Sequence, residues 1–130
     1  AQRVITGGNM DPDWALLRLA RALPDPAPIL QKSIETRMPL LMSGYSRRGE
    51  PAQDTALSWD DRCRVTGREG RDVRSNCRVL RGASGGAVFA RDRSAATYLG
   101  VISRGDSEAL SIFVPLERFR RRITPYLRSG

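Results

Sequence analysis

Residues 82–89 read Gly82-Ala83-Ser84-Gly85-Gly86-Ala87-Val88-Phe89, which places a serine in a turn of very small residues just before an apolar, strand-like run. Glycines allow the backbone of such a turn to bend so that N–H groups converge on one point beside an exposed hydroxyl. That arrangement would make Ser84 a nucleophile with an oxyanion hole next to it. The alternative is an ordinary Gly/Ser turn between two strands, and the surrounding residues are needed to choose between them.

Short strand-like runs separated by turn residues continue on both sides of this turn. The clearest apolar runs span residues 14–19, 39–42, 86–90, 97–103 and 110–114, and two more flank the cysteines at 62–66 and 73–78. Turn residues stand between them at 25–28, 46–49, 67–70 and 104–106. Six or seven short strands at this spacing predict an antiparallel sandwich or barrel.

The C-terminal residues follow a helical pattern. From Pro115 onward the apolar residues recur at helical spacing, at Leu116, Phe119 and Ile123. Proline suits the first turn of a helix, and Pro125 is expected to end this one near Thr124. The pattern predicts a short amphipathic helix whose apolar stripe docks on the barrel.

Composition excludes several classes of function. The 130 residues suffice for one small domain, and no apolar run reaches the roughly 18 residues of a membrane span. The sequence contains no histidine, which excludes a His-containing metal site and a complete Ser-His-Asp enzyme within these residues. Two cysteines cannot form a zinc site alone. We therefore expect no metal and no cofactor.

The charge is strongly positive, at +8, and all but one of the 22 basic residues are arginine. A basic surface attracts nucleic acid or anionic membranes. Here the arginines are spread along the chain, with one dense run at 118–122, and aromatic residues make up only 6%. That is too few for a base-stacking platform, so nucleic acid is not expected as a partner.

Cys63 and Cys77 are the only cysteines of the sequence, and an even pair suggests a disulfide. Closing a loop of this size would stabilise the fold by about 3 kcal/mol. Two free buried thiols are the alternative. A disulfide would indicate an oxidising compartment, so the expected location is secreted or periplasmic.

Two further segments carry chemistry. Asp13 opens the apolar run Asp13-Trp14-Ala15-Leu16-Leu17-Arg18-Leu19, where a carboxylate can be shielded from water and hold an imidazole in one tautomer. Residues 100–105, Gly-Val-Ile-Ser-Arg-Gly, end a buried strand at a small, open edge that can accept an extended peptide by strand addition.

With these residues the sequence resembles the chymotrypsin-like (trypsin-fold) serine proteases, and most of all their bacterial trypsin-like and glutamyl-endopeptidase-like branch. Residues 82–86 match the family's Gly-x-Ser-Gly-Gly motif, and residues 13–17 match its Asp-[Ile/Trp]-Ala-Leu-Leu segment. Gly44-Tyr45 resembles the Gly-Trp/Tyr pair that enters the second barrel, and residues 100–105 match the substrate-edge strand. The resemblance covers nearly the whole chain in the family's order.

The resemblance implies a role for each matched residue. Ser84 would be the acylated nucleophile and Asp13 the triad carboxylate, while the N–H groups of Gly82 and Ser84 would form the oxyanion hole. Ser103 would sit beside Asp13. The substrate backbone would pair with residues 103–105, that is Ser103, Arg104 and Gly105.

Arg78 lies six residues before Ser84, where the family places the base of its primary specificity pocket. The resemblance therefore implies a preference for an acidic substrate side chain. An arginine that points into solvent is the alternative. The family's pancreatic-type members carry an aspartate at the position of Ala83, so activation through an ion pair with a new N-terminus is not expected here.

The resemblance further implies an all-β antiparallel double barrel of the trypsin type, with the second barrel complete and the first only partly present. The expected division is residues 1–30 as a remnant of the first barrel, 31–114 as the second barrel, and 115–130 as the C-terminal helix and tail. Much of the first barrel, including the family's histidine, is not among these residues. It would come from an N-terminal fragment, or be missing from a shortened form.

The expected function is that of a serine endopeptidase acting on a peptide or protein substrate, with the triad histidine supplied by a segment outside this chain. Without that base the Ser84 hydroxyl is a poor nucleophile, so the chain alone is expected to be inactive. Its exposed barrel interface is also expected to make a lone monomer unstable. A catalytically inactive protease-like module that binds peptides or proteins is the alternative.

Overall fold

The computed structural model describes residues 2–8, 13–25, 33–48, 54–78, 83–91, 97–106 and 110–127. Strands dominate this part of the chain, and its helical residues lie near the C-terminal end. In chain order the elements are β1 (Gln2–Thr6), β2 (Ala15–Arg18), β3 (Pro39–Arg48), β4 (Asp54–Glu69), β5 (Asp72–Ser75), β6 (Ala87–Ala90), β7 (Thr97–Gly105), β8 (Ser111–Pro115), the 3-10 helix η1 (Leu116–Arg118) and the helix α1 (Arg120–Leu127).

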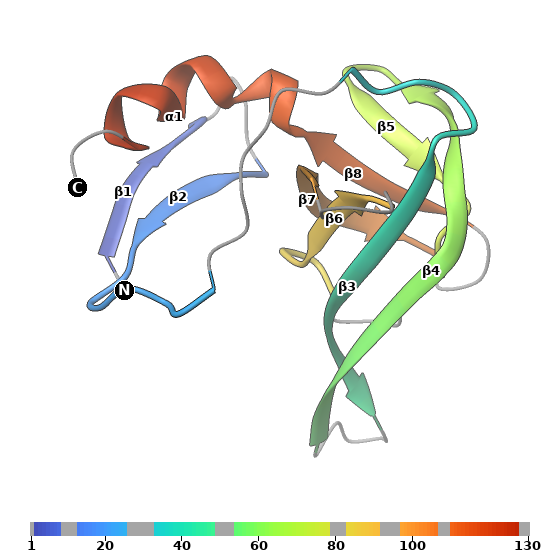
Figure 1. Cartoon of the computed structure of the whole chain (residues 1–130), viewed down its shortest axis with the longest axis horizontal. Coiled ribbons are helices and arrows are strands. Elements are labelled where there is room, and N and C mark those ends of the chain that lie inside the picture. Colours follow the sequence, from blue (N-terminus) through green and yellow to red (C-terminus); the bar gives the residue numbers. More distant parts are fainter. Residues whose placement is uncertain are drawn as a thin grey trace.

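The strands form one closed barrel and one small separate sheet (Figure 1). Around the barrel the order is β3, β4, β5, β8, β7 and β6, and the pairs are antiparallel. β1 and β2 pair only with each other in the described residues, also antiparallel. The predicted class is confirmed: the chain is mainly β, with an antiparallel barrel, part of a second sheet and a C-terminal helix, as in the trypsin-type barrel.

The barrel interior is filled by aliphatic and aromatic side chains from its strands. Leu40, Met42, Val73, Val88 and Phe113 are all fully buried there. Side chains in a strand point alternately to the two faces of the sheet, so one face of each strand supplies this core. Burial of each such side chain stabilises the fold by about 1.5–3 kcal/mol.

A second apolar cluster lies outside the barrel and joins it to the small sheet. Its buried members are Trp14, Val114, Leu116, Phe119 and Ile123, and Ile5 and Leu16 pack against it from β1 and β2. The Trp14 and Phe119 rings stack with centroids 5.3 Å apart. The predicted docking of the C-terminal apolar stripe is thus confirmed, although the stripe packs on the small sheet as well as on the barrel.

The helix itself differs from the prediction. Its first turn is the 3-10 helix η1, and α1 continues through Pro125 to Leu127, so the expected end near Thr124 is wrong. A proline removes the hydrogen bond to the carbonyl four residues earlier, here that of Arg121. Arg121 and Pro125 are both exposed, so water can satisfy the freed carbonyl and the helix tolerates the loss.

The strands β3 and β4 are longer than predicted. Ser46–Arg48 of the expected turn 46–49 belongs to β3, whose pairing with β4 extends to Arg48 opposite Asp54. Residues 67–69 and 104–105 of two other expected turns likewise lie in strands. These stretches are rich in polar residues and glycine, so they lack the alternation of apolar and polar residues that indicates a strand in the sequence. Most of the expected turn 25–28 and the boundary expected at residue 30 lie outside the described residues.

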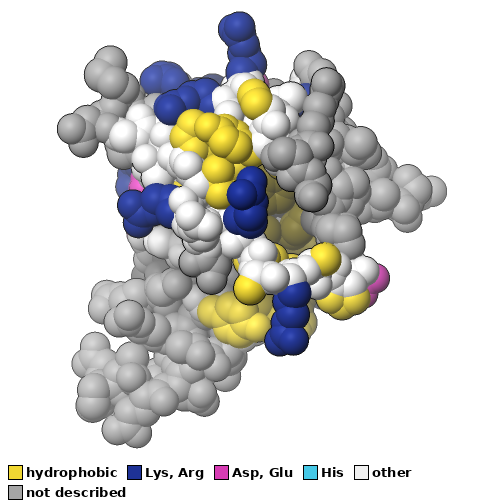
Figure 2. Space-filling view, turned by 90° about the vertical axis from the view of Figure 1, so that its left-hand side faces the viewer, with side chains coloured by type: hydrophobic (Ala, Val, Ile, Leu, Met, Phe, Trp, Pro, Cys, Tyr) yellow, Lys and Arg dark blue, Asp and Glu magenta, His cyan; other side chains and the backbone are white. Residues whose placement is uncertain are grey.

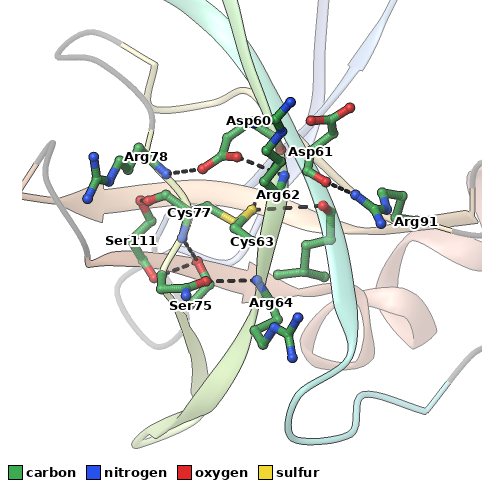
Figure 3. The surroundings of a disulfide bond; sticks show 12 residues. Asp60, Asp61, Arg62, Cys63, Arg64, Ser75, Cys77, Arg78, Arg91 and Ser111 are labelled. Carbon is green, nitrogen blue, oxygen red and sulfur yellow. Dashed lines mark hydrogen bonds between the residues drawn. A yellow bond between two sulfur atoms is a disulfide. The ribbon is translucent and has the colours of Figure 1, made fainter.

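Cys63 and Cys77 form a disulfide, which confirms the predicted pairing (Figure 3). The bond links β4 to the segment that follows β5. Buried serines surround it: Ser75 donates to the carbonyl of Ser111, and the Ser111 hydroxyl donates to the carbonyl of Cys77 at 2.7 Å. These bonds satisfy polar groups inside the barrel. In the described residues, no helix is long and apolar enough to cross a membrane.

Candidate active site

The turn that carries Ser84 is a tight β-turn at the entrance of β6. Gly86 donates its N–H to the carbonyl of Ala83 at 2.9 Å, and Gly85 has a φ of +89°. A positive φ at the third residue is the mark of a type II turn and favours glycine. Ala83 is buried and Ser84 is exposed, so the turn presents the serine side chain at the surface.

Neighbouring strands hold this turn in place. Gly85 donates its N–H to the carbonyl of Ile102 in β7, and Ile102 donates to the carbonyl of Gly86. A Cβ atom on Gly86 would lie 2.4 Å from the Ser43 oxygen, and one on Gly44 would lie 3.0 Å from the Ala83 oxygen. Glycine is therefore required where β3 and the turn approach each other.

Asp13 reaches the same place from the other sheet. It immediately precedes Trp14 and β2, and its φ of +80° lies in the left-handed region, where aspartate is better tolerated than most residues. The Ser103 hydroxyl donates to Oδ2 of Asp13 at 2.6 Å. Asp13 is exposed, which differs from the expectation of a carboxylate shielded from water, because the site opens into a wide pocket at this point.

Ser103 also contacts the candidate nucleophile. The Ser84 hydroxyl donates to the Ser103 carbonyl oxygen at 3.0 Å. One residue of β7 therefore connects the Asp13 carboxylate, through its side chain, and the Ser84 hydroxyl, through its main chain. The structure thus brings together Ser84, the candidate nucleophile, Asp13, the candidate carboxylate, and Ser103, which was expected beside Asp13.

A pocket of about 700 Å³ opens between the small sheet and the barrel, and these residues line it. Its lining includes Arg3, Asp13, Leu17, Ser84, Tyr98 and Ser103. Seen from the side of the small sheet, hydrophobic side chains are exposed over the centre of the molecule, beside basic ones (Figure 2). Leu17, Leu19 and Leu23, which are 49–63% exposed, are the large aliphatic side chains left uncovered on and after β2.

Tyr98 and Arg3 were not identified from the sequence as site residues. Tyr98 lies at the start of β7, and its ring meets the ring of Phe89 edge-on at 6.0 Å. Burial raises the pKa of the Tyr98 phenol from 10.0 to about 12. No local motif indicates either residue as part of a site. Both reach the pocket because their strands, β1 and β7, lie next to it in the fold.

Two other expected site residues, Arg78 and Arg104, do not line this pocket. Gly82 lies outside the described residues. Arg78 is exposed, with its main-chain N–H bonded to Oδ2 of Asp60 at 2.8 Å, and its side chain points away from the disulfide (Figure 3). Arg104 lies 3.8 Å from Oδ2 of Asp72 in an ion pair that is more than half exposed on the arginine side.

Gly105 and the end of β7 form the expected strand edge. On one side, β8 pairs with Arg104 and Gly105 through Ile112 and Ser111. On the other side, the pairing with β6 reaches Val101, and beyond Ile102 no strand among the described residues covers β7. The edge is therefore open next to Ser84.

Metal chemistry has no support in this part of the chain, where no group of three or more His, Cys, Asp or Glu residues could hold an ion. No protein-family model and no curated protein matches the sequence. The function proposed below therefore rests on the geometry of Asp13, Ser84 and Ser103.

Proposed function

We propose that this protein is a serine endopeptidase that forms an acyl-enzyme on Ser84. The observation that supports the proposal most is the hydrogen-bonded connection from Asp13 through Ser103 to Ser84, across 90 residues of sequence. It sets an exposed hydroxyl on a glycine turn beside a carboxylate and an open strand edge. These are the parts that acyl transfer requires, apart from a base.

The base would be a histidine from a polypeptide segment outside these 130 residues, which contain none. Ser103 bonds to one carboxylate oxygen of Asp13, which leaves the other to accept the imidazole N–H. That bond would fix the tautomer of the ring and stabilise its protonated form. The pocket between Asp13 and Ser84 is open enough to admit such a ring.

The proposed reaction then proceeds in two halves. The Ser84 Oγ attacks the peptide carbonyl carbon as the imidazole takes its proton, and the N–H groups of Gly82 and Ser84 bind the oxyanion. The imidazolium gives the proton to the leaving amine as the C–N bond breaks. Water, deprotonated by the same imidazole, adds to the acyl-enzyme and releases the acid with Ser84 restored.

The substrate would bind as an extended strand along residues 103–105. Strand addition supplies main-chain hydrogen bonds for affinity. A substrate N–H donating to the Ser103 carbonyl would displace the Ser84 hydroxyl from it and free that hydroxyl for attack. Arg78 is exposed and does not line the Ser84 pocket, so the structure gives no support to a preference for an acidic substrate side chain.

Three exposed leucines support a partner on the small sheet. A two-stranded sheet is marginally stable alone, and Leu17, Leu19 and Leu23 remain uncovered. An N-terminal fragment that carries the histidine would cover these three leucines. The same fragment would complete the site. The disulfide further supports an oxidising location, secreted or periplasmic.

A non-catalytic peptide-binding module on the same fold is the second candidate. Two observations favour it: the absence of histidine and the Ser84 hydroxyl being engaged by the Ser103 carbonyl. Such a module would use the strand edge without chemistry at Ser84.

Labelling with a fluorophosphonate distinguishes the two candidates. The full-length gene product is treated with the probe, and the adduct is mapped by mass spectrometry, with Ser84→Ala and Asp13→Asn as controls. An adduct on Ser84 that is lost in Ser84→Ala and slowed at least 100-fold in Asp13→Asn is expected. Absence of an adduct in folded protein that still binds peptides would establish the binding module instead.

A further inference from the structure

Four arginines gather on the outer surface of the barrel, away from the Ser84 pocket. Arg37, Arg64 and Arg91 lie beside Pro39 at the start of β3, and Arg62 lies two residues before Arg64 on β4. We call these four residues the basic cluster. Arg64 is the register partner of Pro39, Arg91 donates its N–H to the Pro39 carbonyl, and the N–H of Arg37 bonds to Val65. Arg62 and Arg64, on either side of Cys63, are both exposed on β4, and their side chains extend in opposite directions (Figure 3).

Among the described residues, none of these four arginines forms an ion pair, although Asp60 and Asp61 precede Arg62 and Glu35 lies two residues before Arg37. The four side chains belong to exposed residues, and the ion pairs seen among the described residues use other arginines, namely Arg68, Arg74, Arg104 and Arg118. Arg91 is instead held by the main chain, with Nη1 donating to the carbonyl of Asp61. The cluster thus combines one anchored guanidinium with three that remain available to a ligand.

A cavity of about 420 Å³ opens beside the cluster. Arg37 and Arg91 contribute to its wall together with Glu35, Thr36, Met38 and Pro39. Two guanidinium groups, one carboxylate and one hydroxyl leave this wall with a net positive charge. Guanidinium groups bind tetrahedral oxyanions through paired N–H bonds, so the cavity suits a sulfate or phosphate group.

The backbone at Arg37 gives a second, independent observation. Its φ is +71°, a left-handed conformation that costs an L-residue with a Cβ roughly 1 kcal/mol and that glycine adopts freely. Stability alone would favour glycine at this position. Strain held at a residue that lines a cavity suggests a functional use for that residue.

We propose that the basic cluster and its cavity bind the sulfate groups of an anionic polysaccharide. The disulfide fits an oxidising compartment, where such chains occur, and the cavity wall contains no aromatic residue on which a nucleobase could stack. The surface lies outside the pocket of Asp13, Ser84 and Ser103, so this site is independent of the proposed peptidase function. It would hold the protein on a sulfated matrix.

Binding of a heparin octasaccharide, measured by calorimetry in 50 mM salt, tests the proposal. Arg62→Gln/Arg64→Gln is expected to raise Kd at least tenfold. The control Arg120→Gln/Arg121→Gln removes the same charge from α1, outside the basic cluster, and should change Kd less than twofold. Equal losses in the two double variants would show general charge attraction and overturn the proposal.

Arg37→Gly separates binding from folding. It removes the side chain and relieves the backbone strain of the positive φ at this position. The Tm should therefore stay the same or rise, while the Kd for the octasaccharide increases at least threefold. Unchanged affinity in this variant would exclude the cavity as the site. A single-stranded DNA of equal charge serves as the competing ligand, and tighter binding of the DNA than of the octasaccharide would overturn the assignment to a polysaccharide.

Discussion

The side-chain hydroxyl of Ser103 lies 2.6 Å from Oδ2 of Asp13, 90 residues away in the sequence. This hydrogen bond joins the segment before β2 to the barrel strand β7. A hydrogen bond to a charged group contributes about 1.5–3 kcal/mol, more than a neutral one. The bond therefore helps to hold the small sheet at the pocket, besides orienting the carboxylate.

Replacing Ser103 with alanine tests that double role. The Asp13 carboxylate would lose this donor, and we expect the free energy of unfolding to fall by about 1 kcal/mol, less than the full bond because the site is exposed. Urea unfolding measures the change. Thr66→Ala, on the exposed side of β4, is the matched control and should change stability by less than about 0.5 kcal/mol. An equal effect of both substitutions would show that the Asp13 bond contributes nothing.

The disulfide should account for a large part of the stability of the barrel. It closes a loop with a sequence separation of 14, for which the chain-entropy model gives about 3 kcal/mol. Cys63→Ser/Cys77→Ser is expected to lower the urea midpoint by roughly 1.5 M, at a slope of about 2 kcal/mol/M. Reduction of the parent protein should produce a shift in the same direction, and a midpoint that does not move would contradict the prediction.

Tyr98 should make the fold sensitive to alkali. Burial raises its pKa from 10.0 to about 12, so between these values the unfolded chain releases the phenol proton while the folded protein keeps it. The unfolded state then binds fewer protons, and stability falls as the pH rises from 10 to 12, by on the order of 2 kcal/mol. Urea midpoints at pH 10 and pH 12 measure the loss.

Tyr98→Phe should be less sensitive to this rise in pH than the parent protein, whereas Tyr45→Phe, at an exposed phenol, should behave like the parent. A parent and a Tyr98→Phe variant with the same pH dependence would rule out Tyr98 as the source.

Among the described residues, Asp72 forms the ion pair whose loss should cost most. It contacts Nη1 of Arg118 with both side chains 12–14% exposed, whereas the pair of Arg68 with Glu117 is about half exposed. Asp72→Asn would leave a mostly buried guanidinium beside a neutral amide, at an expected cost of about 3 kcal/mol. Glu117→Gln should cost less than about 1 kcal/mol. Thermal unfolding of the two variants compares them directly, and similar losses would refute the role of burial.

The barrel strands were the most predictable part of the fold. Residues 97–103 and 110–114 are mostly apolar because β7 and β8 are buried on both faces or nearly so. A run of apolar residues indicates such a buried strand in the sequence. β1 was not predicted, because Gln2 and Arg3 are exposed and a register shift between Arg3 and Ile5 interrupts the alternation. The polar residues at the ends of β3 and β4 removed the same signal there.

Local residues indicated Ser84 and Asp13 as candidates, but only the resemblance predicted that Asp13, Ser84 and Ser103 lie together. The small residues around Ser84 indicated a turn, but nothing near Asp13 or Ser103 shows that they meet, since their contact depends on how two sheets pack. Arg78 and Arg104 were assigned by position alone, and neither lines the pocket. The left-handed backbone of Arg37 has no sequence signal, because arginine is not a turn residue.

β8 is buried along its whole length, with Phe113 facing the barrel core and the adjacent Val114 facing the cluster around Trp14. Neighbouring residues of one strand thus belong to two different cores. Any displacement of the small sheet, whether by a docking partner or by a mutation, must shift Val114 and with it the backbone that positions Phe113. The two cores are mechanically coupled, so the protein should lose both in a single cooperative transition.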